Sequence, residues 1–120
     1  MLLEADEPWL AEEHIGSVTV VNLNQSELLD EAVIQAISGQ LYQLVEQPDR
    51  RRLVLNLSAV EKLSTRMLGT FVALHRMIHR SGGRLVLCGI DRGIWEIFAL
   101  LRLPQLLCIC EAEQDALQLF

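Results

Sequence analysis

The chain has 120 residues, of which 51% are hydrophobic and 22% are charged, and its formal net charge is −6. This length is typical of one domain, and the apolar share is large enough to form a buried core, which excludes a disordered chain. The acidic balance argues against a nucleic-acid-binding protein, because such proteins present clustered basic residues to phosphate groups.

Targeting and cysteine usage indicate a cytoplasmic protein that does not enter a membrane. The acidic residues 1–14 lack the basic region and long apolar segment of a secretion signal. No run reaches the roughly 18 uninterrupted apolar residues that a membrane-spanning helix needs. Cys88, Cys108 and Cys110 lie in apolar sequence, so we expect reduced core residues, with the thiols of the last two on opposite faces of a strand.

The order of apolar runs predicts alternating strands and helices. We assign residues 1–14 to an amino-terminal extension in which 9–14 form a short edge strand, and residues 15–120 to the domain. Strands are predicted over 17–23, 53–57, 85–90 and 106–110 from β-branched or continuous apolar residues. Helices are predicted over 29–45, 67–78, 94–101 and 113–119 from apolar residues spaced three to four apart. Leu29 is the first residue on the apolar face of the first helix, and Pro48 ends that helix.

This alternation favours an α/β fold. Strands that are apolar at consecutive positions are covered on both faces, and crossover helices between them imply parallel pairing. We therefore predict one α/β domain with a mostly parallel sheet of four to five strands and about four packed helices.

Sequence motifs for catalysis are absent. The chain has no glycine-rich phosphate-binding motif and no G-x-S-x-G nucleophile motif. His75 and His79 are four residues apart but lack an evident third ligand, so we interpret them as a half-buried structural pair. Trp95 is interpreted as a packing residue. We expect no catalytic residue, no cofactor and no bound metal; a metal- or nucleotide-dependent enzyme is the competing hypothesis.

Two hydroxyl residues stand side by side at the start of the second helix. Ser64 is expected to cap the helix, which contributes about 1 kcal/mol. On a helical wheel with Met67 towards the core, Thr65 points away from the core, beside Gly69, Val72 and Arg76. Glycine inside a helix costs about 1 kcal/mol relative to alanine. Gly69 therefore either lets another protein's backbone approach the hydroxyl or accommodates a neighbouring element of this chain.

Residues 51–90, RRLVLNLSAVEKLSTRMLGTFVALHRMIHRSGGRLVLCGI, carry a family resemblance. Val60, Leu63, Leu68-Gly69 and 82–85 fall in step with the STAS family, the sulfate-transporter and anti-sigma-factor-antagonist domains, and the similarity extends over 15–120. The family's Asp-Ser pair is Ser64-Thr65 here, and its strand-end aspartate is Asn56. Glu27 or Asp30 is the candidate for a further acidic position.

The resemblance implies a non-enzymatic regulator that binds a serine/threonine kinase acting as an anti-sigma factor. In such partner switching, a form of signal transduction that regulates transcription, the kinase phosphorylates a hydroxyl at the helix start, which points to Thr65 first and Ser64 second. The residues expected to bind the partner are Asn56, Ser58, Arg66, Gly69, Val72 and Arg76. The alternative is a constitutive, unphosphorylated STAS adaptor of a transporter or lipid-handling complex. A weak homo-oligomer is compatible with either.

Overall fold

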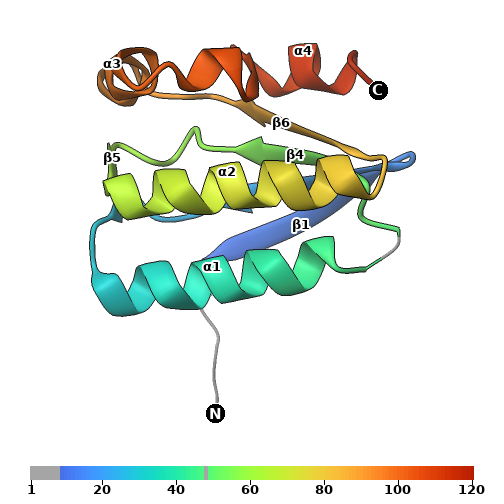
Figure 1. Ribbon diagram of the computed structural model, residues 1–120, viewed down its shortest axis with the longest axis horizontal. Helices are drawn as coiled ribbons and strands as arrows, with labels where there is room; N and C mark the ends of the chain where they lie inside the picture. The colour runs from blue at the N-terminus through green and yellow to red at the C-terminus, as the bar shows by residue number, and fades with distance from the viewer. Residues whose placement is uncertain (1–8, 48) are drawn as a thin grey trace.

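The computed structural model describes residues 9–47 and 49–120 as helices packed on a five-stranded sheet (Figure 1). In the order β1-β2-β4-β6-β7, the sheet strands are β1 (Leu10–Ile15), β2 (Val18–Leu23), β4 (Arg52–Asn56), β6 (Arg84–Cys88) and β7 (Cys108–Cys110). The α-helices are α1 (Glu31–Val45), α2 (Thr65–Arg80), α3 (Arg92–Leu100) and α4 (Glu113–Leu117). A short 3-10 helix, η2 (Leu103–Gln105), follows α3. Within the described residues, no helix has the length and apolarity needed to cross a membrane.

Strand pairing confirms the predicted mostly parallel sheet. β2, β4, β6 and β7 pair in parallel, and only β1 pairs antiparallel, with β2. The turn between β1 and β2 contains Gly16 at φ +62°, a backbone conformation that glycine adopts at little cost. Because parallel strands share a direction, β2, β4, β6 and β7 all end at one edge of the sheet.

Residue alternation along the strands divides the interior between two faces of the sheet. On one face, Leu53 and Leu55 of β4 pack with buried residues of α1, α2 and α3. On the other face, Val54 packs with Val20, Val86 and Ala116, the last of these in α4. Full burial of Leu53, Val54 and Leu55 confirms that β4 is covered on both sides.

The first helix starts later than its apolar pattern predicts. Asp30 is the residue before α1, and its Oδ1 accepts the backbone N–H groups of Ala32 at 2.9 Å and Val33 at 3.2 Å. Leu29 therefore lies outside the helix, with 51% of its surface exposed, and its assignment to the apolar face was wrong. Pro48, expected to end this helix, lies outside the described residues.

The cysteines do not divide between two faces as expected. Residues two apart in a strand share a face, so Cys108 and Cys110 both pack towards the cluster under α4, beside buried Cys88. Burial, together with the charge of Glu113 and the nearby Cys110, raises the pKa of Cys88 to about 11. That thiol is therefore un-ionised at neutral pH, as a core residue should be.

A second, two-stranded parallel sheet escaped the sequence prediction. β3 (Glu27–Leu28) pairs with β5 (Lys62–Leu63), directly before α1 and α2 respectively. The backbone N–H of Ser64 continues this pairing by donating to the carbonyl of Leu28 at 2.9 Å. The starts of the two helices are thereby tied together.

Gly83 is required by close backbone packing. A Cβ added there would lie 2.2 Å from the carbonyl oxygen of Arg51, which also accepts the N–H of Arg84 at 2.7 Å where β4 and β6 begin to pair. We predict that Gly83→Ala lowers the free energy of unfolding by about 1–3 kcal/mol, a typical cost of overpacking. Gly39→Ala is the matched control, because a Cβ at that position of α1 meets no atom of the described residues within 4 Å, and alanine favours helix. Urea denaturation should move the two midpoints in opposite directions, and equal midpoints would contradict the assignment.

Candidate functional site

Ser64 caps α2, as its position predicts. Its backbone is extended, at φ −72° and ψ 146°, and its hydroxyl oxygen accepts the backbone N–H of Arg66 at 3.2 Å. The side chain is half-buried, and the backbone N–H is already engaged with Leu28. The hydroxyl and the backbone N–H of Ser64 thus both form hydrogen bonds that fix the helix start.

Thr65 is the first residue of α2, and its side chain is exposed. The opposite side of the helix is the core side, where Met67, Phe71, Leu74 and Ile78 are buried. The first backbone N–H groups of a helix lack partners within the helix and carry partial positive charge. An oxygen on Thr65 is therefore accessible to another molecule at a place that stabilises negative charge.

The stripe that follows Thr65 on α2 lies on the surface. Gly69 and Arg76 are exposed, and Val72 is half-buried. A Cβ built on Gly69 meets no atom within 4 Å, in the part of the chain that the structure describes. Close packing against another element of this chain therefore does not explain why residue 69 is glycine. The glycine leaves open space beside Thr65.

Arg66 links the start of α2 to α1. Its guanidinium forms an ion pair with Glu31, the first residue of α1, and both side chains are more than half exposed. Lys62 and Glu27 form a second exposed pair, at 3.7 Å, across the β3–β5 pair. The sequence pattern does not reveal Glu27 and Glu31 as the partners of Lys62 and Arg66, because each pair is separated by 35 positions in the chain.

Asn56 and Ser58 sit at the end of β4, on the α4 side of the sheet. The Asn56 side chain donates to Glu113 Oε1 at 3.0 Å, and its Oδ1 accepts the backbone N–H of Ser58 at 2.9 Å. Gly89, at φ +72°, passes so close that an added Cβ would lie 2.3 Å from Ser58 Oγ. The structure thus places these two predicted binding residues with α4, and the other four along α2.

A buried hydroxyl pair between α1 and α2 has no signal in the sequence. Ser38 and Thr70 are 9% and 6% exposed, and their hydroxyl oxygens lie 2.8 Å apart in a hydrogen bond. Thr70 stands two residues after Leu68, at the border of the apolar stripe. Because buried hydroxyls need partners, this bond fixes how the two helices face each other.

His75 and His79 stack with ring centroids 5.8 Å apart. Partial burial, and then the nearby His79 and Arg76, lower the pKa of His75. Within 9–47 and 49–120, no group of three or more His, Cys, Asp or Glu side chains is arranged to hold a metal ion. The pair is half-buried at His75 and exposed at His79.

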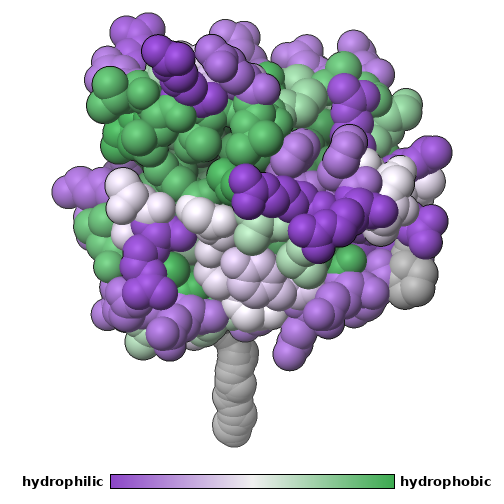
Figure 2. Space-filling view, viewed as in Figure 1, coloured by the Kyte–Doolittle hydropathy of each residue, from purple (hydrophilic) through white to green (hydrophobic). Residues whose placement is uncertain are grey.

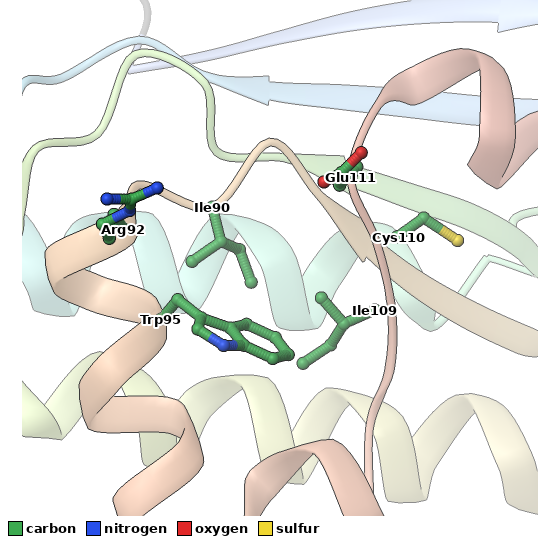
Figure 3. Close-up of a pocket in the computed structure, with 6 residues that line it drawn as sticks. All are labelled: Ile90, Arg92, Trp95, Ile109, Cys110 and Glu111. Carbon is green, nitrogen blue, oxygen red and sulfur yellow. The ribbon is translucent and has the colours of Figure 1, made fainter.

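A cavity of about 420 Å³ lies beside α3, at the carboxyl ends of β6 and β7. Its lining residues are Ile90, Arg92, Trp95, Ile109, Cys110 and Glu111 (Figure 3). The Trp95 ring faces Ile109 across the cavity, while the charged groups of Arg92 and Glu111 lie towards its edges. Trp95 is 40% exposed and borders this open recess.

The chain belongs to the STAS domain family, which matches residues 10–116. It is similar in fold to an anti-sigma factor antagonist from Mycobacterium paratuberculosis, with TM-score 0.80, 22% identity and coverage of 91% of this chain and 90% of that one. An anti-sigma-factor antagonist (STAS) domain protein from Planctomyces limnophilus gives TM-score 0.76 at 18% identity, covering 91% and 95%. The Bacillus cell fate determinant SpoIIAA in its phosphorylated form has a TM-score of 0.69 and 16% sequence identity. The match covers 91% of this chain and 96% of that one. The predicted fold and family are thereby confirmed.

The two hydroxyls at the helix start should differ in their effect on stability. Ser64→Ala removes the acceptor of the Arg66 N–H, and we predict a loss of about 1 kcal/mol in the free energy of unfolding. Thr65→Ala is the matched control, because the exposed side chain is replaced by a better helix former, and the change should stay within about 0.5 kcal/mol. Thermal and urea denaturation measure both. Equal losses would show that Ser64 is not the cap.

The side-chain amide of Asn56 is predicted to contribute to stability through its hydrogen bond to Glu113. In Asn56→Asp, a carboxylate replaces the donor and faces Glu113, which raises the pKa of both carboxyl groups in the folded protein. The folded state then binds more protons than the unfolded state, so its stability increases as pH falls. We expect a deficit of about 1–2 kcal/mol relative to wild type at pH 7 that shrinks below about pH 5.

Asn22→Asp is the control for this experiment, because the Asn22 side chain also donates to a glutamate, Glu13 at 3.3 Å, but in an exposed contact. Solvent screening should keep its deficit below about 0.5 kcal/mol at every pH. A deficit for Asn56→Asp that does not change with pH would contradict repulsion by Glu113.

Proposed function

We propose that the chain is a cytoplasmic, non-enzymatic antagonist that binds a serine/threonine kinase anti-sigma factor and is switched off by phosphorylation of Thr65. The observation that carries the proposal is the exposed Thr65 side chain directly after a serine whose hydroxyl is engaged as the helix cap. Ser64 is the second candidate acceptor. The unmodified form would bind the kinase and so release the sigma factor.

The fold offers a place where a phosphate can be added without remodelling. Phosphorylation adds a charge of about −1.5 to −2, and the N-terminus of a helix stabilises such a charge. Fold relatives support this step, since SpoIIAA has been described in both an unphosphorylated and a phosphorylated form. Nothing in the core contacts of α2 requires Thr65 to stay neutral, because its side chain lies on the exposed side.

Arg66 is the cation nearest in sequence to the proposed phosphate. A phosphate on Thr65 would compete with Glu31 for the Arg66 guanidinium, which is more than half exposed. An exposed ion pair contributes only about 0–1 kcal/mol, so its exchange leaves the fold intact. The consequence of phosphorylation is then a change of surface charge at the start of α2, and not a change of conformation.

The proposed partner surface extends from Thr65 along Gly69, Val72 and Arg76, with Arg66 at its border. Gly69 lets the partner's backbone come close to the Thr65 hydroxyl, and Val72 adds apolar contact. Asn56 and Ser58 lie on the α4 side of the sheet, but at the edge where β4 ends, so a partner that reaches around this edge would also contact them. An interface fitted to a neutral hydroxyl loses affinity when that group becomes an anion, and a penalty of about 3 kcal/mol reduces affinity about a hundredfold.

The decisive experiment uses the kinase encoded nearest to the gene, with Mg-ATP. We expect intact-mass measurement to show one added phosphate on the wild type and on Ser64→Ala, and none on Thr65→Ala. Thr65→Asp should bind the kinase about a hundredfold more weakly by calorimetry while keeping its thermal stability near that of the wild type, since Thr65 is exposed.

The alternative, a constitutive STAS adaptor of a transporter or lipid-handling complex, is favoured by the replacement of the family's two acidic positions with Asn56 and Ser64. No added phosphate, together with equal kinase binding by wild type and Thr65→Asp, would support the adaptor and refute the switch. Phosphate on Ser64 alone would support regulation by phosphorylation but would show that the acceptor is Ser64 and not Thr65.

A further inference from the structure

Residues 62–90, which include β5, α2 and β6, are basic although the whole chain is acidic. The chain has 16 Asp and Glu residues, but none of them lies in this segment. The segment contains five of the ten lysine and arginine residues and two of the three histidines: Lys62, Arg66, His75, Arg76, His79, Arg80 and Arg84. Figure 2 shows strongly hydrophilic residues gathered over the carboxyl-terminal half of α2, which Figure 1 labels. One sign of charge is concentrated here, which favours an anionic ligand.

The arginines in the second half of this segment have no carboxylate partner. The two basic residues beside the start of α2 form exposed ion pairs with glutamates of β3 and α1. Within the described residues, no ion pair includes Arg76, Arg80 or Arg84. Their charge is therefore available to another molecule.

A cavity of about 190 Å³ lies where the end of α2 meets the starts of β6 and β7. His75, His79 and Arg84 line it with polar groups, and Leu106 and Cys108 also line it. None of the described residues that line it is Asp or Glu. The volume corresponds to about six water molecules at about 30 Å³ each, which leaves room for a phosphate group with a small substituent.

The Arg84 side chain is positioned by contacts that leave donors free. Its Nη1 donates to the carbonyl oxygen of Leu119 at 3.0 Å, and its Nη2 lies 4.0 Å from Cys108 Sγ. Because a guanidinium group carries five N–H donors, other donors remain for a ligand. The planar guanidinium group binds the oxygens of a phosphate group in pairs, which suits it to a site for this anion.

His75 and His79 bring two more donors to the same cavity. Their rings stack with centroids 5.8 Å apart. In the free protein, partial burial and then the neighbouring His79 and Arg76 lower the pKa of His75, because an imidazolium ion repels another cation. A bound anion favours the protonated form of both rings, so binding is accompanied by proton uptake. The charged or titratable groups around the two rings are Arg76 and Arg80 of α2, Arg84 of β6 and Cys108 of β7, and none of them is a carboxyl group.

We propose that this cavity binds a doubly charged oxyanion, either free phosphate or the phosphate group of a small molecule, between Arg84 and the pair of His75 and His79. His75 follows Thr65 by ten residues, or about 15 Å along α2, so the site is separate from the proposed phosphorylation site. A zinc ion on His75, His79 and Cys108 is the competing occupant. In the described parts of the chain, however, no three His, Cys, Asp or Glu side chains form a group that could hold a metal ion.

Calorimetric titration with sulfate and with inorganic phosphate at low ionic strength tests the proposal. We expect saturable binding of one anion per chain. Arg84→Gln and His79→Gln should each weaken binding about tenfold or more, because each removes a charge-assisted hydrogen bond. Arg80→Gln is the matched control, because it removes the same charge from the end of α2 but its side chain does not line the cavity, and binding should change less than about twofold. Since His79 is exposed, its replacement should leave the fold intact, which thermal denaturation verifies.

Phenyl phosphate distinguishes the two sources of the phosphate group. Tighter binding of phenyl phosphate than of inorganic phosphate would identify a phosphate ester whose substituent contacts Leu106, which is 42% exposed. The reverse order would identify free phosphate as the ligand.

The pH dependence of sulfate binding measures the contribution of the histidines. Between about pH 6 and about pH 8, where histidine loses its proton, sulfate keeps its double charge. We expect its affinity for the wild type to fall about tenfold or more over this range, and to stay nearly constant in the double variant His75→Gln with His79→Gln. No saturable binding, equal losses in Arg80→Gln and Arg84→Gln, or an affinity that does not change with pH would each overturn the proposal. Stoichiometric zinc binding that is lost in Cys108→Ser would also overturn it, in favour of a metal site.

Discussion

Burial of β4 on both faces is the constraint on which the rest of the structure depends. Leu53 and Leu55 face α1 and α2, while Val54 faces α4, and none of the three is exposed. A strand that is apolar on both sides needs helices on both sides, and its neighbours β2 and β6 must then be reached by crossovers, which makes the pairing parallel. Parallel pairing in turn brings the strand ends to one edge, where α2 begins.

The start of α2 is fixed by contacts from outside that helix. The β3–β5 pair, the Arg66–Glu31 ion pair and the buried Ser38–Thr70 hydrogen bond all join α2 to α1 or to the residues just before it. The Ser38–Thr70 hydrogen bond is buried and therefore shielded from water, whereas the Arg66–Glu31 ion pair is exposed and can exchange partners at little cost. The proposed phosphate on Thr65 would therefore change the charge of the surface and leave the buried helix packing as it is.

The sequence predicted those features that repeat locally. The spacing of Met67, Phe71, Leu74 and Ile78 gave the buried side of α2, and the position of Ser64 before that spacing gave the cap. Two-residue strands such as β3 and β5 carry too few residues for any periodic signal. Pairs such as Asn56–Glu113, 57 positions apart, form only once the fold brings them together, and propensity cannot reveal them.

Two predictions failed for different physical reasons. Leu29 fits the helical spacing, but Asp30 caps α1 with its side chain, and a residue before the cap has no place on the helix. Cys108 and Cys110 were placed on opposite faces, whereas alternation along a strand puts residues two apart on the same face. That correction gathers three thiols under α4, and burial, together with nearby Glu113 and Cys110, raises the pKa of Cys88, the innermost of them.

The surfaces of α2 and α3 differ in what they cost the isolated monomer. Along α2, the exposed stripe is hydroxyl, glycine and arginine at three of its four positions, groups that water solvates well, so a partner there can come and go without leaving the monomer unstable. On α3, hydrating the exposed apolar side chains of Leu100 and Leu101 is unfavourable, so a contact that buried them would be favourable. A phosphate on Thr65 would therefore oppose docking along α2, where the exposed group is a neutral hydroxyl, and would have no such effect on the apolar side chains of α3.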